Sequence, residues 1–231
     1  MNALQWMKGE GRAIGGYMAA NFSRDLEDYF QLGNFLDPNF AKPKYDSILV
    51  GGLCEGNGRV VKKGCSSKDS KIFVFNSFQS IYKIAKKLGR CVDDNFNGER
   101  FEIFGRSMGG IVLRIALVRG YISPEKISKI NTMGTPHQGT IVPLFFPYSL
   151  LIPSCREMLP TSKLIRELKN QKLPNEIEYT NIYSATWDEF CVPKKNLIWD
   201  NDLVNNLPIP AAGHADILSK GLGLKSGELL G

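Results

Sequence analysis

The stretch "FGRSMGGIV", residues 104–112, places one serine between glycines, directly after one apolar run and directly before another. Residues 105–109 fit the pattern G-x-S-x-G, in the expected order of strand, sharp turn and helix. A serine at such a turn has a strained backbone, and larger neighbours would clash as the helix packs back on the strand. Ser107 is therefore either a plain turn residue or a nucleophile.

Around this stretch, short apolar runs alternate with helical patterns. We expect buried strands at residues 46–53, 71–75, 101–105, 126–134 and 178–185. Residues 76–89 show apolar residues at helical spacing and are expected to end at Gly89, and 111–120 form a largely apolar helix. This alternation predicts an α/β fold with a mostly parallel sheet flanked by helices, in a single domain over residues 1–231.

Two regions break the alternation. Residues 1–45 are expected to form an N-terminal helical segment that leads into the core. Residues 140–176 are expected to form a lid-like excursion over the carboxyl ends of the strands. It contains the apolar, proline-rich run "IVPLFFPYSLLIP" (141–153) and a helix that starts at Thr161 or Ser162, with Leu164, Ile165 and Leu168 on one face. The apolar run is either ordinary core or a wall over a ligand pocket.

Composition excludes several classes of protein. The chain of 231 residues has a formal net charge of +6, but its lysines are scattered and no basic run suggests nucleic acid binding. Five widely spaced cysteines exclude a complete disulfide framework, and with only two histidines and no C-x-x-C pair a zinc site is not expected. No apolar signal segment is recognised and run 141–153 is too short to span a bilayer, so a cytoplasmic location is expected.

A serine nucleophile needs a histidine base, which in turn needs a carboxylate to orient it. The two histidines, His137 and His214, both follow Ser107, and His214 lies in a loop near the C-terminus, "PIPAAGHADIL". Asp188, in "YSATWDEFCVP" after the fifth expected strand, is the first choice for the acid. Glu189, Asp200 and Asp202 remain alternatives.

Four segments together carry a resemblance: "GRSMGG", "NTMGTPHQGT", "IYSATWDEFCVP" and "AAGHADIL", in this order over about residues 46–220. They resemble a compact bacterial lipase or esterase of the α/β-hydrolase superfamily. The resemblance implies Ser107 as nucleophile, Asp188 as acid and His214 as base. It implies hydrolysis of carboxylic esters through an acyl-enzyme, without a metal or an organic cofactor, and points to lipid metabolism.

The resemblance also implies an oxyanion hole made by the backbone N–H groups of Leu53 and Met108. The histidine that usually precedes the loop glycine is replaced by Gly51, and the histidine that usually precedes the nucleophile is replaced by Arg106, which could favour anionic substrates. The apolar excursion is expected to contact the acyl chain through four residues: Phe145, Phe146, Leu150 and Leu151.

The alternatives are an acyl thioesterase or deacylase with the same triad, and a non-catalytic binding protein on a hydrolase scaffold. The expected partner is a small-molecule or lipid acyl ester, with peripheral contact to an anionic membrane as a further option and no nucleic acid. His137 is expected to brace a loop near the site. Cys54 and Cys191 are expected to be inert thiols.

Overall fold

The computed structural model describes residues 46–53, 70–73, 75–96, 100–186, 188–210, 213–214 and 217. The expected N-terminal helical segment (1–45) and Cys54 lie outside these residues. Among the helices of the described part, none combines the length and the apolar character needed to cross a membrane.

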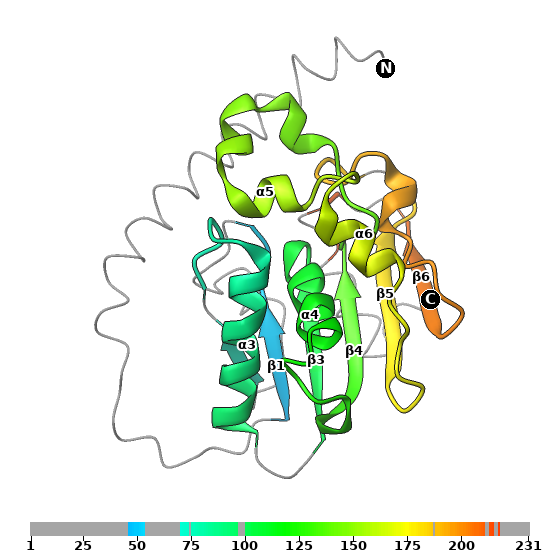
Figure 1. Ribbon diagram of the computed structural model, residues 1–231. Coiled ribbons are helices and arrows are strands. Elements are labelled where there is room, and N and C mark those ends of the chain that lie inside the picture. Colours follow the sequence, from blue (N-terminus) through cyan, green and yellow to red (C-terminus); the bar gives the residue numbers. More distant parts are fainter. Residues whose placement is uncertain are drawn as a thin grey trace.

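Six strands form one parallel sheet in the order β2-β1-β3-β4-β5-β6 (Figure 1). They are β1 (Ser47–Val50), β2 (Ser70–Phe73), β3 (Phe101–Arg106), β4 (Ile127–Met133), β5 (Glu178–Ser184) and β6 (Val204–Ile209). The predicted α/β class and parallel sheet are confirmed, and the five predicted strands are present.

The sixth strand, β6, was missed, and the prediction that the segment from Pro208 onward is loop is wrong at its first two residues. The strand reads "VNNLPI", and its polar residues and proline do not match a buried strand. Proline has no N–H to donate, and in a central strand the N–H of every residue faces a neighbouring strand. A strand with only one neighbour tolerates proline where the missing N–H would face away from that neighbour. β6 pairs with β5 alone among the described strands.

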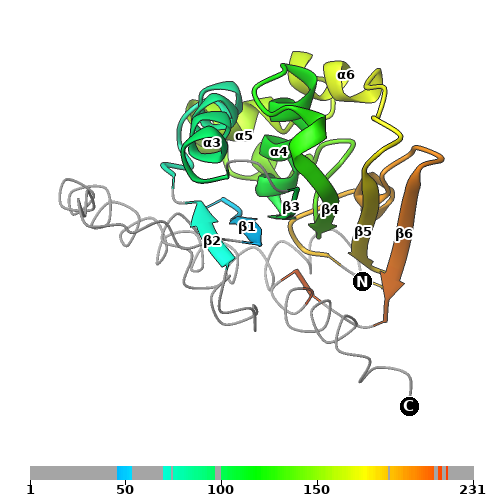
Figure 2. The same cartoon turned by 90° about the horizontal axis from the view of Figure 1, so that it is seen from below.

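Helices α3 (Ile81–Asn95) and α4 (Met108–Val118) cover one face of the described sheet. Helices α5 (Pro153–Glu157) and α6 (Lys163–Lys169) belong to the excursion after β4. Single 3-10 turns occur at η2 (Pro124–Lys126), η3 (Val142–Phe145), η4 (Pro147–Leu151) and η5 (Lys194–Leu197). Figure 2 shows α3 and α4 side by side over the sheet, where their apolar side chains join those of β1, β3 and β4 in the main core.

The predicted boundaries of two helices are wrong. Helix α3 begins at Ile81, five residues into the segment 76–89 that was expected to be helical, and it does not end at Gly89 but continues to Asn95. A Cβ added at Gly89 would lie 2.3 Å from the carbonyl oxygen of Tyr121, so this glycine permits close packing rather than ending the helix. Helix α4 begins at Met108, three residues before its predicted start. The apolar periodicity marked the buried parts of both helices and not their ends.

The structure of the excursion after β4 agrees more closely with the sequence-based predictions. Ser162 precedes α6 and its hydroxyl accepts a hydrogen bond from the N–H of Ile165, as a helix cap does. The three residues predicted to share one face of α6, Leu164, Ile165 and Leu168, are all buried. The run 141–153 forms two 3-10 turns followed by α5, each with a proline in its first two positions, where a missing N–H costs nothing. In Figure 1, α5 lies above the ends of the strands.

The strand order creates a crevice at one place. β1 lies between β2 and β3. After β1 the next strand of the chain, β2, lies on one side of it, and after β3 the next strand, β4, lies in the opposite direction across the sheet. Loops that leave adjacent strands in opposite directions open a crevice at the carboxyl ends, where open α/β sheets bind ligands. Leu53 follows β1 and Ser107 follows β3, so both lie at this crevice.

Glycines allow the main chain to approach closely around Ser107. A Cβ added at Gly105 would lie 2.7 Å from Cα of Gly110, and one at Gly109 would lie 2.2 Å from the carbonyl oxygen of Val50. The obstacles are backbone atoms, which a side-chain rotation cannot move. These glycines therefore let α4 begin immediately after β3 and against the end of β1.

We predict that Gly109→Ala destabilises the protein. Helix propensity alone would stabilise an alanine in α4 by up to about 1 kcal/mol. The clash with the carbonyl of Val50 is of the overpacking kind, which costs about 1–3 kcal/mol, so the free energy of unfolding should fall. Urea denaturation measures it, and a rise in stability would contradict the packing described here.

Candidate active site

Ser107 occupies a strained turn between β3 and α4. Its φ is 52° and its ψ is −124°, and it is the only non-glycine residue with a positive φ in the part of the chain that the structure describes. Such conformations cost about 1–3 kcal/mol and persist where surrounding structure enforces them. The N–H of Ser107 donates to the carbonyl of Met133 at 2.9 Å, which ties the turn to the end of β4.

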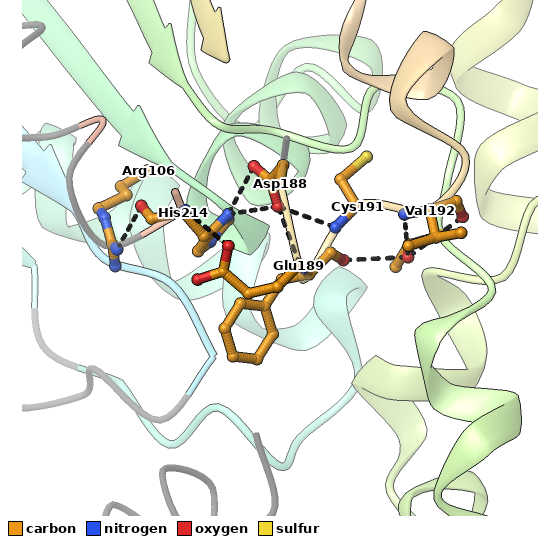
Figure 3. A network of polar contacts seen from close by, with 8 residues as sticks. Arg106, Asp188, Glu189, Cys191, Val192 and His214 are labelled. Carbon is orange, nitrogen blue, oxygen red and sulfur yellow. Dashed lines mark hydrogen bonds and ion pairs between the residues drawn. The ribbon is translucent and has the colours of Figure 1, made fainter. Parts of the chain in front are cut away.

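Asp188 and His214 form a buried pair at the same edge of the sheet (Figure 3). Nδ1 of His214 lies 2.8 Å and 3.0 Å from the two carboxylate oxygens of Asp188, and the two residues are 7% and 1% exposed. A carboxylate can only accept, so Nδ1 carries the proton and Nε2 is left with a lone pair. The backbone N–H groups of Phe190 and Cys191 donate to the same carboxylate at 2.9 Å.

The other carboxylates considered from the sequence lie elsewhere. Glu189 accepts a hydrogen bond from the main-chain N–H of His214, not from its ring. Asp200 is exposed and lines a separate polar cavity, and Asp202 is exposed. Among the described residues, Asp188 is therefore the carboxylate that orients the His214 ring.

Ser107 and His214 both lie close to the segment 133–134. The carbonyl of Met133 accepts a hydrogen bond from the N–H of Ser107. A Cβ added at Gly134 would be 3.3 Å from Cε1 and Nδ1 of the His214 ring. No hydrogen bond joins the Ser107 hydroxyl to the ring among the described residues. Catalytic hydrogen bonds often shorten only when substrate is bound.

An apolar cavity of about 40 Å³ opens beside Ser107. It is lined by Leu53, Ser107, Pro136, Thr140, Val142, Pro143, Phe146, Ser149, Cys155, Met158 and Phe190. The ring of Phe190 also contacts that of His214, with centroids 5.1 Å apart. The cavity therefore lies between the serine, the histidine side of the site and the excursion after β4.

The four residues expected to contact an acyl chain are placed differently from one another. Phe146 lines the cavity. Phe145 and Leu151 are exposed, at 43% and 76%, and Leu150 is partly exposed; none of these three lines the cavity. The irregular 3-10 turns decide which side chains point inward, and no helical or strand period describes them.

The two expected oxyanion donors lie at the crevice. Met108 is the first residue of α4, and N–H groups in the first turn of a helix have no acceptor within the helix. Leu53 follows β1 and lines the cavity beside Ser107. Their backbone N–H groups thus belong to the segments that directly follow β3 and β1, the two strands that flank the crevice.

Arg106 is buried, at 4% exposure, and its Nη2 donates to the main-chain carbonyl of His214 at 3.1 Å. It does not line the cavity. This placement differs from the expectation that Arg106 attracts anionic substrate. The sequence showed that Arg106 is unusual at this position. Its contact with His214 could not be predicted, because residues 108 positions apart leave no local sequence pattern.

His137 lies in a second buried network, behind the cavity wall. Arg114 donates to its Nδ1 at 3.2 Å, so Nε2 carries the proton and faces Oδ1 of Asn181 at 3.2 Å. Trp199 stacks on its ring with centroids 4.5 Å apart. Burial, and next the Arg114 charge, hold the pKa of His137 well below 6.5. Burial also lowers the pKa of Arg114, to about 9.

The described cysteines near the site are poor nucleophiles. Burial, and next the Asp188 charge, hold the pKa of Cys191 well above its usual range. Burial raises the pKa of Cys155, which lines the cavity, to about 11. Thiolates are the reactive form, so both side chains act as small apolar groups here.

We predict that His137 makes stability depend on pH. Its folded pKa lies below the unfolded value of about 6.5, so its contribution is full above pH 6.5 and is lost as pH falls below it. One such proton is worth about 1.4 kcal/mol between pH 7.5 and 5.5. Urea denaturation at pH 7.5 and at pH 5.5 measures the effect. On going from pH 7.5 to 5.5, the free energy of unfolding should fall by about 1.4 kcal/mol less in His137→Gln than in the wild type. An unchanged difference would contradict the assignment.

Comparison with known proteins supports the fold. No protein-family model and no curated protein matches the chain. Bacillus licheniformis lipase BlEst2 is similar in structure, with a TM-score of 0.59 at 14% identity over 80% of this chain and 90% of that chain. Aspergillus fumigatus lipase B gives a TM-score of 0.55 at 18% identity over 73% and 45% of the two chains.

A third solved structure names the fold directly. MGS-MChE2, an α/β-hydrolase enzyme from the metagenome of sediments of the lagoon of Mar Chica, Morocco, gives a TM-score of 0.55 at 17% identity, over 79% of this chain and 89% of that chain. The chain therefore has the α/β-hydrolase fold, which is the fold that its motifs predicted.

Proposed function

We propose that this protein is a serine hydrolase that cleaves carboxylic esters through an acyl-enzyme on Ser107. The observation that carries the proposal is the buried contact of His214 Nδ1 with both oxygens of Asp188, next to Gly134, whose neighbour Met133 accepts a hydrogen bond from a serine in a strained turn. This is the pairing that makes a serine hydroxyl reactive at neutral pH.

In the proposed reaction, the Ser107 oxygen attacks the acyl carbonyl while Nε2 of His214 takes the hydroxyl proton. Asp188 stabilises the imidazolium that forms. The N–H groups of Met108 and Leu53 stabilise the negative oxygen of the tetrahedral intermediate. The intermediate then expels the alcohol, which receives the proton from His214. A water, deprotonated by His214, attacks the acyl-enzyme and releases the carboxylic acid and the free serine.

The substrate side of the proposal rests on the cavity. Its lining is apolar apart from three hydroxyls, which favours an acyl chain over a peptide. Two of the structural neighbours are named lipases, which agrees with ester hydrolysis. A thioester differs only in its leaving group and remains the second candidate for the same site.

The size of the cavity favours short acyl groups. The cavity of about 40 Å³ is only a few times larger than the volume of about 10–15 Å³ that one water needs, so it favours a short acyl chain over a long one. Met158 and Cys155 are almost completely buried and line the same cavity. We therefore propose esters of short acyl chains, such as butyrate, as the preferred substrates.

We predict that Asp188→Asn lowers kcat for p-nitrophenyl butyrate by about 10⁴-fold, because the imidazole loses the carboxylate that fixes its tautomer. Asp202→Asn, an exposed carboxylate that the sequence left open as the acid, is the matched control and should retain activity. A folded wild type that hydrolyses neither esters nor thioesters would instead favour the binding-protein alternative.

We predict that Met158→Ala shifts the preference toward longer acyl chains, because it removes a buried side chain from the cavity wall. Each additional methylene that becomes buried contributes about 0.8 kcal/mol, or about fourfold in kcat/KM. A panel of p-nitrophenyl esters from acetate to laurate measures the shift. Leu151→Ala, which truncates an exposed residue outside the cavity, is the control and should leave the chain-length preference unchanged. A shift in preference in Leu151→Ala but not in Met158→Ala would show that the acyl chain binds along the outer surface of the excursion.

A further inference from the structure

His214 lies in a loop, five residues after the end of β6. A general base on a loop must be held within a fraction of an ångström of its working position. The ring contact with Asp188 fixes one atom of the imidazole, Nδ1. The direction in which Nε2 points also depends on the main chain of residue 214, and this main chain has two charged partners.

Glu189 and Arg106 hold the two polar groups of the His214 main chain. The N–H of His214 donates to Oε2 of Glu189 at 3.0 Å, and its carbonyl accepts from Nη2 of Arg106 at 3.1 Å. Hydrogen bonds to ionised groups are shorter and about twice as strong as those between neutral groups. Figure 3 shows His214 between Arg106 on one side and Asp188 and Glu189 on the other.

Both residues are chain neighbours of the proposed triad. Arg106 immediately precedes Ser107, and Glu189 immediately follows Asp188. A displacement of the His214 main chain relative to the serine or the acid would therefore break one of these contacts. The arrangement ties the position of the base to the serine from which it takes a proton and to the aspartate that orients its ring.

The local geometry fits this role. A Cβ added at Gly213 would be 3.3 Å from Oε2 of Glu189, so a side chain at that position would crowd the carboxylate. Arg106 is 4% exposed, at the end of β3, where the sheet fixes its backbone. Neither residue lines the cavity beside Ser107, so neither is placed to bind the acyl group.

We infer that Arg106 and Glu189 are positioning residues that clamp the main chain of His214 and hold its imidazole in line with Ser107. This inference rests on the proposed function. The clamp acts on the base and not on substrate binding, so its loss lowers kcat and leaves KM unchanged. A purely structural role would instead lower thermal stability without a specific loss of kcat.

Glu189 provides the sharper test. Glu189→Ala removes the acceptor, and we expect kcat for p-nitrophenyl butyrate to fall by about 10- to 100-fold, the loss that a misplacement of about 1 Å produces. KM should stay within about twofold. Glu189→Gln keeps an amide oxygen that accepts from the His214 N–H, so it should recover most of the wild-type kcat.

Arg106→Ala should lower kcat in the same way, and the double variant should lose less than the product of the two single losses, because both side chains hold one residue. Arg119 and Glu167 form an ion pair of the same residue types at 2.7 Å, remote from the cavity. Arg119→Ala and Glu167→Ala are therefore matched controls and should keep the wild-type kcat.

The outcomes separate the two proposals. If the wild type hydrolyses esters and Ser107→Ala does not, yet Glu189→Ala and Arg106→Ala keep full kcat, the clamp is overturned and the proposed function stands. Equal losses in Glu189→Ala and Glu189→Gln would also overturn it. If Arg106→Ala does not fold, the Glu189 pair decides. A folded wild type without esterase or thioesterase activity overturns both proposals.

Discussion

The backbone contact between the start of α4 and the ends of β1 and β3 is the constraint on which the site depends. Gly105 and Gly109 leave no space for a Cβ, so the helix begins directly after the strand and Ser107 must take up the turn with φ 52°. The same contact brings Gly109, the residue after Met108, against the carbonyl groups of Val50 and Gly51, shortly before Leu53. One packing requirement therefore positions the serine and both expected oxyanion donors at the crevice.

The remaining parts of the site are joined by hydrogen bonds between distant segments. Thr140 accepts from the N–H of Val192 and donates to the carbonyl of Phe190, which links the start of the excursion to the loop that carries Asp188. Glu189, Asp188 and Arg106 connect that loop and the end of β3 to His214. The excursion, Asp188 and His214 are thus held as one unit.

The sequence predicted the parts of this structure that have a short-range pattern. Apolar runs located five of the six strands, and a helix cap with an apolar face located α6. The sequence-based prediction missed β6, whose two asparagines and proline suit the edge that β6 forms among the described strands. It also ended α3 at Gly89, which is a glycine that permits close packing. Arg106 and Glu189 were singled out from the sequence, but their contacts with His214 could not be predicted, because these contacts join segments that are far apart in the chain. The sequence also could not show which apolar residues of the excursion line the cavity. Their directions are set by 3-10 turns that contain prolines, and neither a helical nor a strand periodicity describes such turns.

Mass spectrometry of the protein after reaction with a fluorophosphonate tests the central claim most directly, namely that Ser107 is an activated nucleophile. Trypsin cleaves after Arg106 and Arg114 and releases residues 107–114, "SMGGIVLR", in which Ser107 is the only hydroxyl-bearing residue. The account predicts one adduct per chain, on this peptide, and none in His214→Ala. A folded wild type that stays unmodified, or an adduct on another peptide, would contradict it.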